Sequence, residues 1–313
     1  MEQRRLGPRG PMLSAIGLGC NNFGMKLAED EAAQVVHTAL EVGITHFDTA
    51  EQYGGGVSET LLGRALGRDR PTVTIATKFN PRPAGEFRPG DLARRIVEAC
   101  EGSLRRLSTD HIDLYYQHYP DPEAPAEELF DALTTLVDAG KIRHAAISNA
   151  DVEHLQPCGI GTSSVTWSGL QTEWSLLERA AEEKLIPAAL AAGLGVIPYF
   201  PLASGLLTGK YQRGKQYPAG SRLATLAWSE NVATEDNFAR VERLEEFARG
   251  RGHTILDLAL GWLLSQVGVS SVIAGATTPA QVRSNAAASI WRLNAEELSG
   301  VDAALRSVEG VPR

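Results

Sequence analysis

The feature that most constrains the fold of this chain is an alternation of short apolar runs with amphipathic helical stretches, from one end to the other. The runs are rich in β-branched residues, and helical patterns such as 30–43, 89–107 and 125–140 lie between them. Strands that alternate with helices form βαβ units and a parallel sheet. The sequence therefore predicts strands at 16–20, 44–48, 72–79, 111–118, 142–148, 165–171, 195–200 and 271–275.

Eight strands within about 260 residues favour a closed (β/α)8 barrel over an open sheet. The alternative is a doubly wound sheet, but no GxGxxG motif follows an early strand, as is usual for a dinucleotide site in that fold. Segment 4–14 is expected to form a two-stranded hairpin over the base of the barrel. We expect one domain over residues 1–313 with helices at its C-terminal end, interrupted by a long stretch of weak pattern at 204–233.

Composition and charge narrow the classes of partner. The formal net charge is -8 and no basic cluster is present, which argues against a nucleic-acid partner. No segment reaches the roughly 20 apolar residues of a membrane span. Cys20, Cys100 and Cys158 are an odd number without metal-ligand spacing, so we expect reduced thiols, no metal site and a cytoplasmic location. Oligomeric state stays open.

Polar side chains follow three neighbouring predicted strands, where a barrel carries its chemistry. Asp48 ends one strand and Tyr53 follows five residues later, Lys78 lies on the next strand, and His118 ends the third. A strand lysine inside a barrel is costly unless it is paired. His46 lies two residues before Asp48 on the same face and is expected to pack deeper in the barrel.

These four residues form a plausible proton-transfer set. A phenol has an ordinary pKa near 10, and a buried ammonium beside Tyr53 is expected to lower that pKa. Asp48 would keep Lys78 charged, and His118 would donate to a carbonyl oxygen that becomes an alkoxide. The set lacks a strong nucleophile, so it suits proton donation during hydride delivery.

The chain resembles an aldo-keto reductase, and the motifs that carry the resemblance span nearly all of it in family order. They are GLGCNNFG (17–24), FDTAEQYGGGVSETLLGRAL (47–66), TKF (77–79), QHYPDP (117–122), GKIRHAAISN (140–149), QTEWSLLER (171–179), PYFPLASGLLTGKY (198–211) and GATTPAQVRSN (275–285). The resemblance implies that Asp48, Tyr53, Lys78 and His118 are the catalytic tetrad, with Tyr53 as general acid in reduction.

The resemblance also implies an NADP(H) site and a small carbonyl substrate. The nicotinamide would stack on Tyr199, with its carboxamide held by Ser148, Asn149 and Gln171. The remaining implied cofactor contacts are Gly19, Cys20, Asn21, Phe200, Pro201, Leu202, Gly205, Leu207, Lys210, Arg222, Gly275, Thr277, Gln281 and Asn285.

The pattern is similar to the branch of potassium-channel β subunits and bacterial general stress reductases. Trp174 stands where that branch often has Tyr, and Ser284 replaces the usual acidic residue before Asn285. Because no lysine occupies the place where the aldose reductase branch grips the 2′-phosphate, Arg222 and Arg283 are the candidates for that role. NADP(H) is therefore expected over NAD(H).

Two other functions compete with a carbonyl reductase. A cofactor-sensing regulatory subunit with slow catalysis would keep the same tetrad, whereas a Schiff-base lyase built on Lys78 would leave the cofactor motifs without a role. Substrate choice would depend on segments 120–126 and 204–233 and on the C-terminal tail. Candidate apolar walls of the substrate pocket are Phe23, Tyr119, Trp174 and Trp228.

Overall fold

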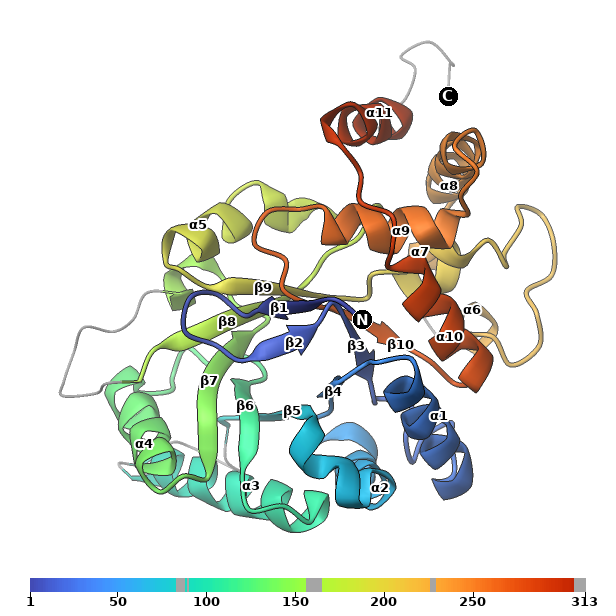
Figure 1. Cartoon of the computed structure of the whole chain (residues 1–313). Coiled ribbons are helices and arrows are strands. Elements are labelled where there is room, and N and C mark those ends of the chain that lie inside the picture. The colour runs from blue at the N-terminus through green and yellow to red at the C-terminus, as the bar shows by residue number, and fades with distance from the viewer. Residues whose placement is uncertain (83–87, 89, 156–164, 226–228, 307–313) are drawn as a thin grey trace.

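The computed structural model describes residues 1–82, 88, 90–155, 165–225 and 229–306. Its central element is one sheet of eight strands, surrounded by helices (Figure 1). In chain order the strands are β3 (Ile16–Gly19), β4 (His46–Asp48), β5 (Thr74–Phe79), β6 (Ile112–Gln117), β7 (Ile142–Ser148), β8 (Trp167–Glu173), β9 (Gly195–Tyr199) and β10 (Val272–Gly275).

The eight strands close into a barrel. Their order is β10-β3-β4-β5-β6-β7-β8-β9, and each neighbouring pair is parallel. The two ends of this series meet where Val196 of β9 bridges Val269, just before β10. The Val196 amide donates to Gly268 O at 2.9 Å, and the Ser270 amide donates to Val196 O at 2.9 Å. The predicted (β/α)8 barrel is confirmed.

The N-terminal hairpin closes the base of the barrel, as predicted. Strands β1 (Gln3–Arg5) and β2 (Met12–Ser14) pair antiparallel, and Leu6 and Leu13 join the apolar cluster inside the barrel. Leu6 occupies space that two inward-facing glycines leave open. A Cβ on Gly169 would lie 2.7 Å from Leu6 Cδ1, and one on Gly195 would lie 2.6 Å from it. Small residues on β8 and β9 therefore admit the hairpin as a plug.

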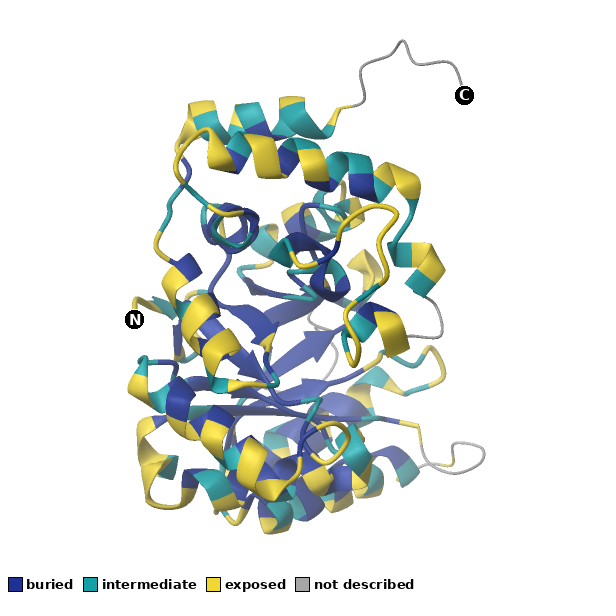
Figure 2. Cartoon of the chain, turned by 90° about the vertical axis from the view of Figure 1, so that its right-hand side faces the viewer, coloured by how far each residue is buried: buried dark blue, intermediate teal, exposed yellow. Residues whose placement is uncertain are grey.

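Helices cover the outer face of the sheet (Figure 1). The strand residues that point outward are buried against them in the larger apolar cluster, so the core forms two layers around the barrel wall (Figure 2). The longer helices are α1 (Glu29–Glu41), α2 (Val57–Leu66), α3 (Asp91–Leu107), α4 (Ala126–Asp138), α5 (Leu185–Ala191), α8 (Glu235–Arg249), α9 (Ile255–Leu264), α10 (Pro279–Ala288) and α11 (Ala295–Leu305).

The last helices begin at side-chain caps that the sequence supplies. Thr254 and Asn294 form capping boxes at the starts of α9 and α11, and Thr278 caps α10 ahead of Pro279. Helix α9 is apolar on almost every side, because it packs against α8 and α10 as well as against β10 of the barrel. In the described part of the stretch of weak pattern at 204–233, the elements are all short: η5 (Ala203–Thr208), α6 (Arg222–Thr225) and α7 (Ser229–Val232).

The described residues include no helix long and apolar enough to cross a membrane.

Candidate active site

A buried ion pair lies at the carboxyl ends of β4 and β5. Lys78 is fully buried, and its Nζ lies 2.5 Å from Asp48 Oδ1 and donates to Thr49 O at 2.8 Å. The second carboxylate oxygen of Asp48 accepts from Gln171 Nε2 at 2.8 Å. Burial is the largest single effect and acts to lower the pKa of Lys78, but Asp48 and Tyr53 together outweigh it, so the pKa is raised. Lys78 therefore stays positively charged.

Tyr53 lies beside this ammonium. It begins the short helix η1 (Tyr53–Gly56), whose Gly54, Gly55 and Gly56 all have positive φ, so the chain folds back tightly after the tyrosine. Lys78 Nζ lies 5.1 Å from the centroid of the Tyr53 ring. Sequence and geometry thus agree on the neighbourhood of the phenol and the cation.

The expected lowering of the Tyr53 pKa is wrong, because the pKa is raised. Burial raises the pKa of Tyr53 by more than the Lys78 charge lowers it, so the net shift is upward. The sequence showed the neighbouring cation but not the extent to which folding removes water from the phenol. At neutral pH Tyr53 is therefore protonated, which is the form that a proton donor needs.

His118 completes the cluster from the end of β6. Its side chain is 4% exposed, and its ring packs edge-on to Tyr53 with 5.8 Å between centroids. Burial, aided by the Lys78 charge, lowers the pKa of His118 to about 3, so the imidazole is neutral at pH 7. Its buried Nδ1 has no partner in the part of the chain described. Since buried unpaired donors are rarer than acceptors, we assign the ring proton to Nε2.

Asn149 links the ends of three strands next to this cluster. It follows β7 with φ 55, a left-handed conformation that asparagine tolerates better than most residues. Its Nδ2 donates to His118 O at 2.9 Å, and its Oδ1 accepts from the Tyr199 hydroxyl at 2.7 Å. Ser148 Oγ lies 3.2 Å from the same Nδ2. Thus Ser148, Asn149 and Tyr199 form one hydrogen-bonded group beside His118.

The residues expected to hold the rest of a cofactor extend from this group along two loops. After β9, Phe200 has positive φ and its ring lies 4.9 Å from the Arg222 guanidinium. Gly205 and Leu207 are buried in η5, and Lys210 Nζ lies over the Tyr211 ring. Pro201 and Leu202 lie between Phe200 and η5. These contacts bring Arg222 close to the loop, although it is distant in sequence.

The other loop joins β10 to α10. Gly275 pairs in register with Gly19 of β3, and a Cβ on Gly275 would meet nothing nearer than Asn22 Nδ2 at 3.9 Å. Gln281 Oε1 accepts from the Thr277 amide at 2.7 Å, and Asn285 is buried on α10.

Cys20 and Asn21 follow Gly19, and the Cys20 amide donates to Asp48 O. Gly275 leaves open space at this strand end, whereas a Cβ on Gly19 would lie 3.0 Å from Ile273 Cγ2.

Arg283 differs from the other predicted contacts. It forms an ion pair with Glu41 at 2.8 Å, and both side chains are more than half exposed. Nothing in its contacts links it to the loop after β9. Of the two arginines proposed for a 2′-phosphate, only Arg222 lies against that loop.

The predicted substrate walls are only partly compatible with the structure. Tyr119 is 46% exposed and stacks on His118 with 4.4 Å between ring centroids. Phe23 and Trp174 are buried, and Trp174 packs against Trp262 and donates to Glu182. Phe23 and Trp174 are therefore core residues and do not form a wall of a substrate pocket. Trp228 lies outside the described residues.

Two further residues on the inner face of the barrel, Tyr116 and Glu173, were not predicted from the sequence. Tyr116 pairs in register with Lys78, and its hydroxyl is buried without a partner among the described residues. Glu173 ends β8 two residues after Gln171 and pairs in register with Tyr199. Side chains alternate along a strand, so both share the inward direction of their neighbours. Counting two residues back from His118 and two forward from Gln171 would have found them.

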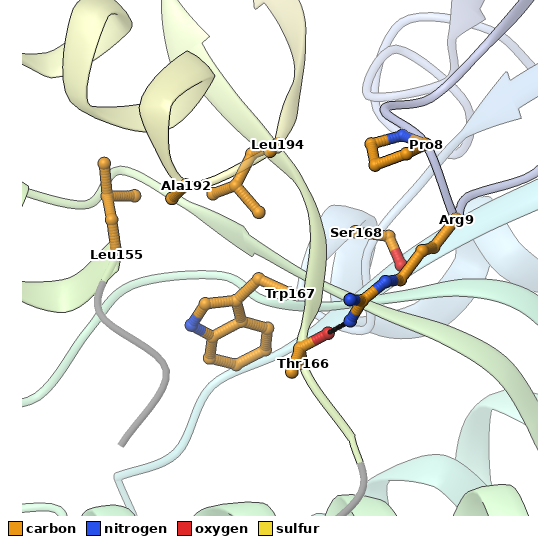
Figure 3. Close-up of a pocket in the computed structure, with 9 residues that line it drawn as sticks. Pro8, Arg9, Leu155, Thr166, Trp167, Ser168, Ala192 and Leu194 are labelled. Carbon is orange, nitrogen blue, oxygen red and sulfur yellow. Dashed lines mark hydrogen bonds between the residues drawn. The ribbon is translucent and has the colours of Figure 1, made fainter. Parts of the chain in front are cut away.

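Two cavities of the described structure lie away from the Tyr53 cluster. One of about 240 Å³ lies at the base of the barrel between the hairpin and the start of β8, and it is lined by Pro8, Arg9 and Trp167 among others (Figure 3). Another of about 430 Å³ includes Thr45, Asp113 and Arg143. Neither includes a residue of the Tyr53 cluster. Among the described residues, no three His, Cys, Asp or Glu side chains converge as a metal site.

A phenol, a cation and a neutral imidazole at the carboxyl end of a barrel are suited to proton transfer in an enzyme, and comparison with known proteins identifies the family. Residues 15–306 match the model of the Aldo/keto reductase family, and the chain belongs to that family. Members of this family use nicotinamide cofactors and act on small carbonyl compounds.

Individual relatives agree with this assignment. The chain is 32% identical over 321 residues to the aldo-keto reductase YhdN of Bacillus subtilis (strain 168), covering 100% of this chain and 96% of the relative. It is 33% identical over 297 residues to a probable voltage-gated potassium channel subunit beta of Oryza sativa subsp. japonica, covering 91% and 90%. The structure of the glycerol dehydrogenase AKR11B4 from Gluconobacter oxydans matches with TM-score 0.83 and 30% identity, covering 97% and 94%.

Proposed function

We propose that this chain is an NADP(H)-dependent reductase that converts aldehydes or ketones to alcohols, with Tyr53 as the general acid. The observation that carries the proposal is the fully buried Lys78, paired with Asp48 and lying 5.1 Å from the Tyr53 ring centroid. A buried cation beside a phenol stabilises the phenolate that remains after the proton leaves.

Each residue of the cluster would have a different role in the reaction. Bound NADPH would supply the hydride. Tyr53, protonated because its pKa is raised, would give its proton to the carbonyl oxygen. Lys78 would stabilise the resulting phenolate. The neutral His118, carrying its proton on Nε2, would hold the carbonyl oxygen in place by a hydrogen bond rather than transfer a proton.

The chain's own groups suit such a cofactor. The inward Tyr199 ring would carry the nicotinamide, and the amide and hydroxyl groups of Ser148, Asn149 and Gln171 would hold its carboxamide. The open space beside Gly275 leaves room for part of a dinucleotide at this strand end. Arg222 would contact the 2′-phosphate, which favours NADP(H) over NAD(H). The other predicted contacts, from Cys20 to Asn285, keep the roles proposed from the sequence.

The proposal extends to the setting of the enzyme. Cys20 and Cys100 are both free thiols, which suits a reducing compartment, and we propose the cytoplasm. We also propose that residues 1–313 act as one domain on a small-molecule substrate, without nucleic-acid or membrane partners.

The test is an NADPH titration followed by tryptophan fluorescence, and then a panel of aldehydes, ketones and sugars. The wild type should bind NADPH and reduce members of the panel. Lys78→Met should bind NADPH within about threefold of wild type but lose more than about 100-fold in kcat. Because this change leaves Asp48 buried without its cation, the double variant Lys78→Met/Asp48→Asn serves as a folded control. Full activity of Lys78→Met at neutral pH would refute the role of the ammonium.

A regulatory subunit with slow reductase activity is the second candidate. The observation in its favour is the 33% identity to a protein named as a probable channel β subunit. This function would require a stoichiometric partner in a pull-down, together with turnover below about one per minute on every carbonyl tested. Fast turnover on a simple aldehyde would exclude it as the main function.

A further inference from the structure

The charges around the Tyr53 cluster do not balance. The Lys78 ammonium and the Asp48 carboxylate compensate each other at 2.5 Å. Glu173, on the same inner face, forms no hydrogen bond or ion pair through its side chain with any residue that the structure describes. Glu173 is exposed at the end of β8, and its carboxylate has no cation partner within the described chain.

The position of Glu173 follows from the register of the barrel. Gln171 points inward, since its side chain reaches Asp48 across the barrel, and Glu173 lies two residues further on the same strand. The neighbour of Glu173 across the β8–β9 pairing is Tyr199. Glu173 is thus a neighbour of Tyr199, the proposed nicotinamide platform, and lies on the same face as Gln171, the proposed carboxamide contact.

Electrostatics give an independent sign of this proximity. The pKa of Tyr199 is raised, first by burial and next by the negative charge of Glu173. The same field acts on any charged group that is placed against the Tyr199 ring, and it falls off with distance as Coulomb's law requires. A cation there is stabilised, and a neutral ring is not.

We infer that Glu173 makes the site bind the oxidised nicotinamide more tightly, relative to the reduced form, than a site without this carboxylate would. The inference rests on the proposed function, because it needs a nicotinamide on Tyr199. The oxidised ring carries a formal positive charge and the reduced ring carries none, so the carboxylate discriminates between the two forms.

This preference bears on the direction of the reaction. In reduction the carbonyl carbon gains the hydride from NADPH and its oxygen gains the proton of Tyr53, leaving an alcohol, NADP⁺ and a phenolate. A site that stabilises the oxidised cofactor makes the bound couple a stronger reductant. For a two-electron couple, a tenfold change in the ratio of the two dissociation constants corresponds to about 30 mV. Glu173 therefore biases the enzyme toward carbonyl reduction.

The experiment compares the dissociation constants of NADP⁺ and NADPH by calorimetry for wild type and Glu173→Gln. The substitution removes the charge and keeps nearly the same shape. The ratio Kd(NADP⁺)/Kd(NADPH) should rise about fivefold to twentyfold, mainly through weaker NADP⁺ binding. Glu173→Asp keeps the charge and should leave the ratio within about threefold of wild type. Glu183→Gln, which removes an exposed carboxylate further along the chain, should leave it unchanged.

The outcomes separate this inference from the proposed function. If wild type binds neither NADP⁺ nor NADPH, the proposed function fails and the inference fails with it. If both cofactors bind and Glu173→Gln changes the two dissociation constants equally, or changes neither, the electrostatic role is wrong while the proposed function stands. A rise of the ratio in Glu173→Asp as large as in Glu173→Gln would also overturn it, since shape rather than charge would then be responsible.

Discussion

The two ends of the barrel each bury a histidine on the inner face, and the comparison between them separates structural from chemical polarity. His46 at the base is fully buried, and His118 at the rim is 4% exposed. Burial is the largest cause of a lowered pKa in both, to about 4 in His46 and about 3 in His118. Burial and neutrality alone therefore do not distinguish the reactive end.

The neighbours of each histidine do distinguish it. Ser271 Oγ gives its one proton to Ser14 O, so His46 Nδ1 donates to Ser271 Oγ at 2.9 Å in a network closed by the hairpin. His118 instead packs edge-on against Tyr53, although the charge of Lys78 acts on both histidines. A titratable phenol beside the histidine therefore marks the functional end, whereas hydroxyls and glycines mark the packed end.

Removing one tyrosine hydroxyl beside Lys78 and one from the packed core tests this comparison most directly. Tyr53→Phe should lower kcat for carbonyl reduction by at least about 1,000-fold, because it removes the proposed proton donor beside Lys78, while Kd for NADPH stays within about twofold. Tyr115→Phe removes a hydroxyl that is buried without a partner in the described chain, and it should leave kcat unchanged. Stopped-flow and steady-state assays on both variants provide the measurement. Retained turnover in Tyr53→Phe would remove it as the acid.

Much of the fold could be predicted because the spacing of apolar residues within a short stretch of sequence indicates whether that stretch forms a strand or a helix. The eight strands and the hairpin were predicted from runs of apolar residues, but the ends of strands were not fixed by them. Strand β8, for example, extends to Glu173, two residues past the predicted end at 171. This difference is why the sequence did not reveal Glu173 as an inward-facing residue.

The site was predicted only as far as residue type and strand position allow. Tyr53, Lys78, Asp48 and His118 could be grouped because the carboxyl ends of neighbouring parallel strands meet at one rim. The sign of the Tyr53 pKa shift depends on how much water folding removes from the phenol. That amount depends on all the side chains that pack around Tyr53 in the folded protein. The left-handed Asn149, which joins His118 to Tyr199, likewise depends on three strands brought together by the barrel.

The two histidines also predict how stability depends on pH. Unfolded histidine binds a proton as the pH falls below about 6.5, whereas His46 and His118 stay neutral in the folded protein until about 4 and about 3. The contribution of the two histidines to the free energy of unfolding is therefore complete above pH 6.5. It decreases as the pH is lowered, by about 2 kcal/mol per histidine between pH 7 and pH 5. Urea unfolding across this range measures the effect.

Substitution of each histidine distinguishes the two ends. His46→Gln and His118→Gln should each remove about half of this histidine-linked loss of stability. Only His118→Gln should also lower kcat/KM for a carbonyl substrate, since only its ring adjoins Tyr53. An equal loss of activity in both variants would mean that the closed base contributes to the chemistry after all.

The smallest expected effect concerns two arginines that the sequence treated as equals. Arg222 lies with its guanidinium 4.9 Å from the Phe200 ring, and burial lowers its pKa, so its environment is partly shielded from water. Arg283 is more than half exposed and paired with Glu41 at 2.8 Å, where solvent weakens any further electrostatic attraction. Arg222→Ala should raise Kd for NADPH about tenfold and Kd for NADH less than twofold, because only NADPH carries the 2′-phosphate. Arg283→Ala should leave both dissociation constants within about twofold. Equal losses for NADPH and NADH in Arg222→Ala would mean that the arginine supports the loop after β9 through its contact with Phe200, and that another group holds the phosphate.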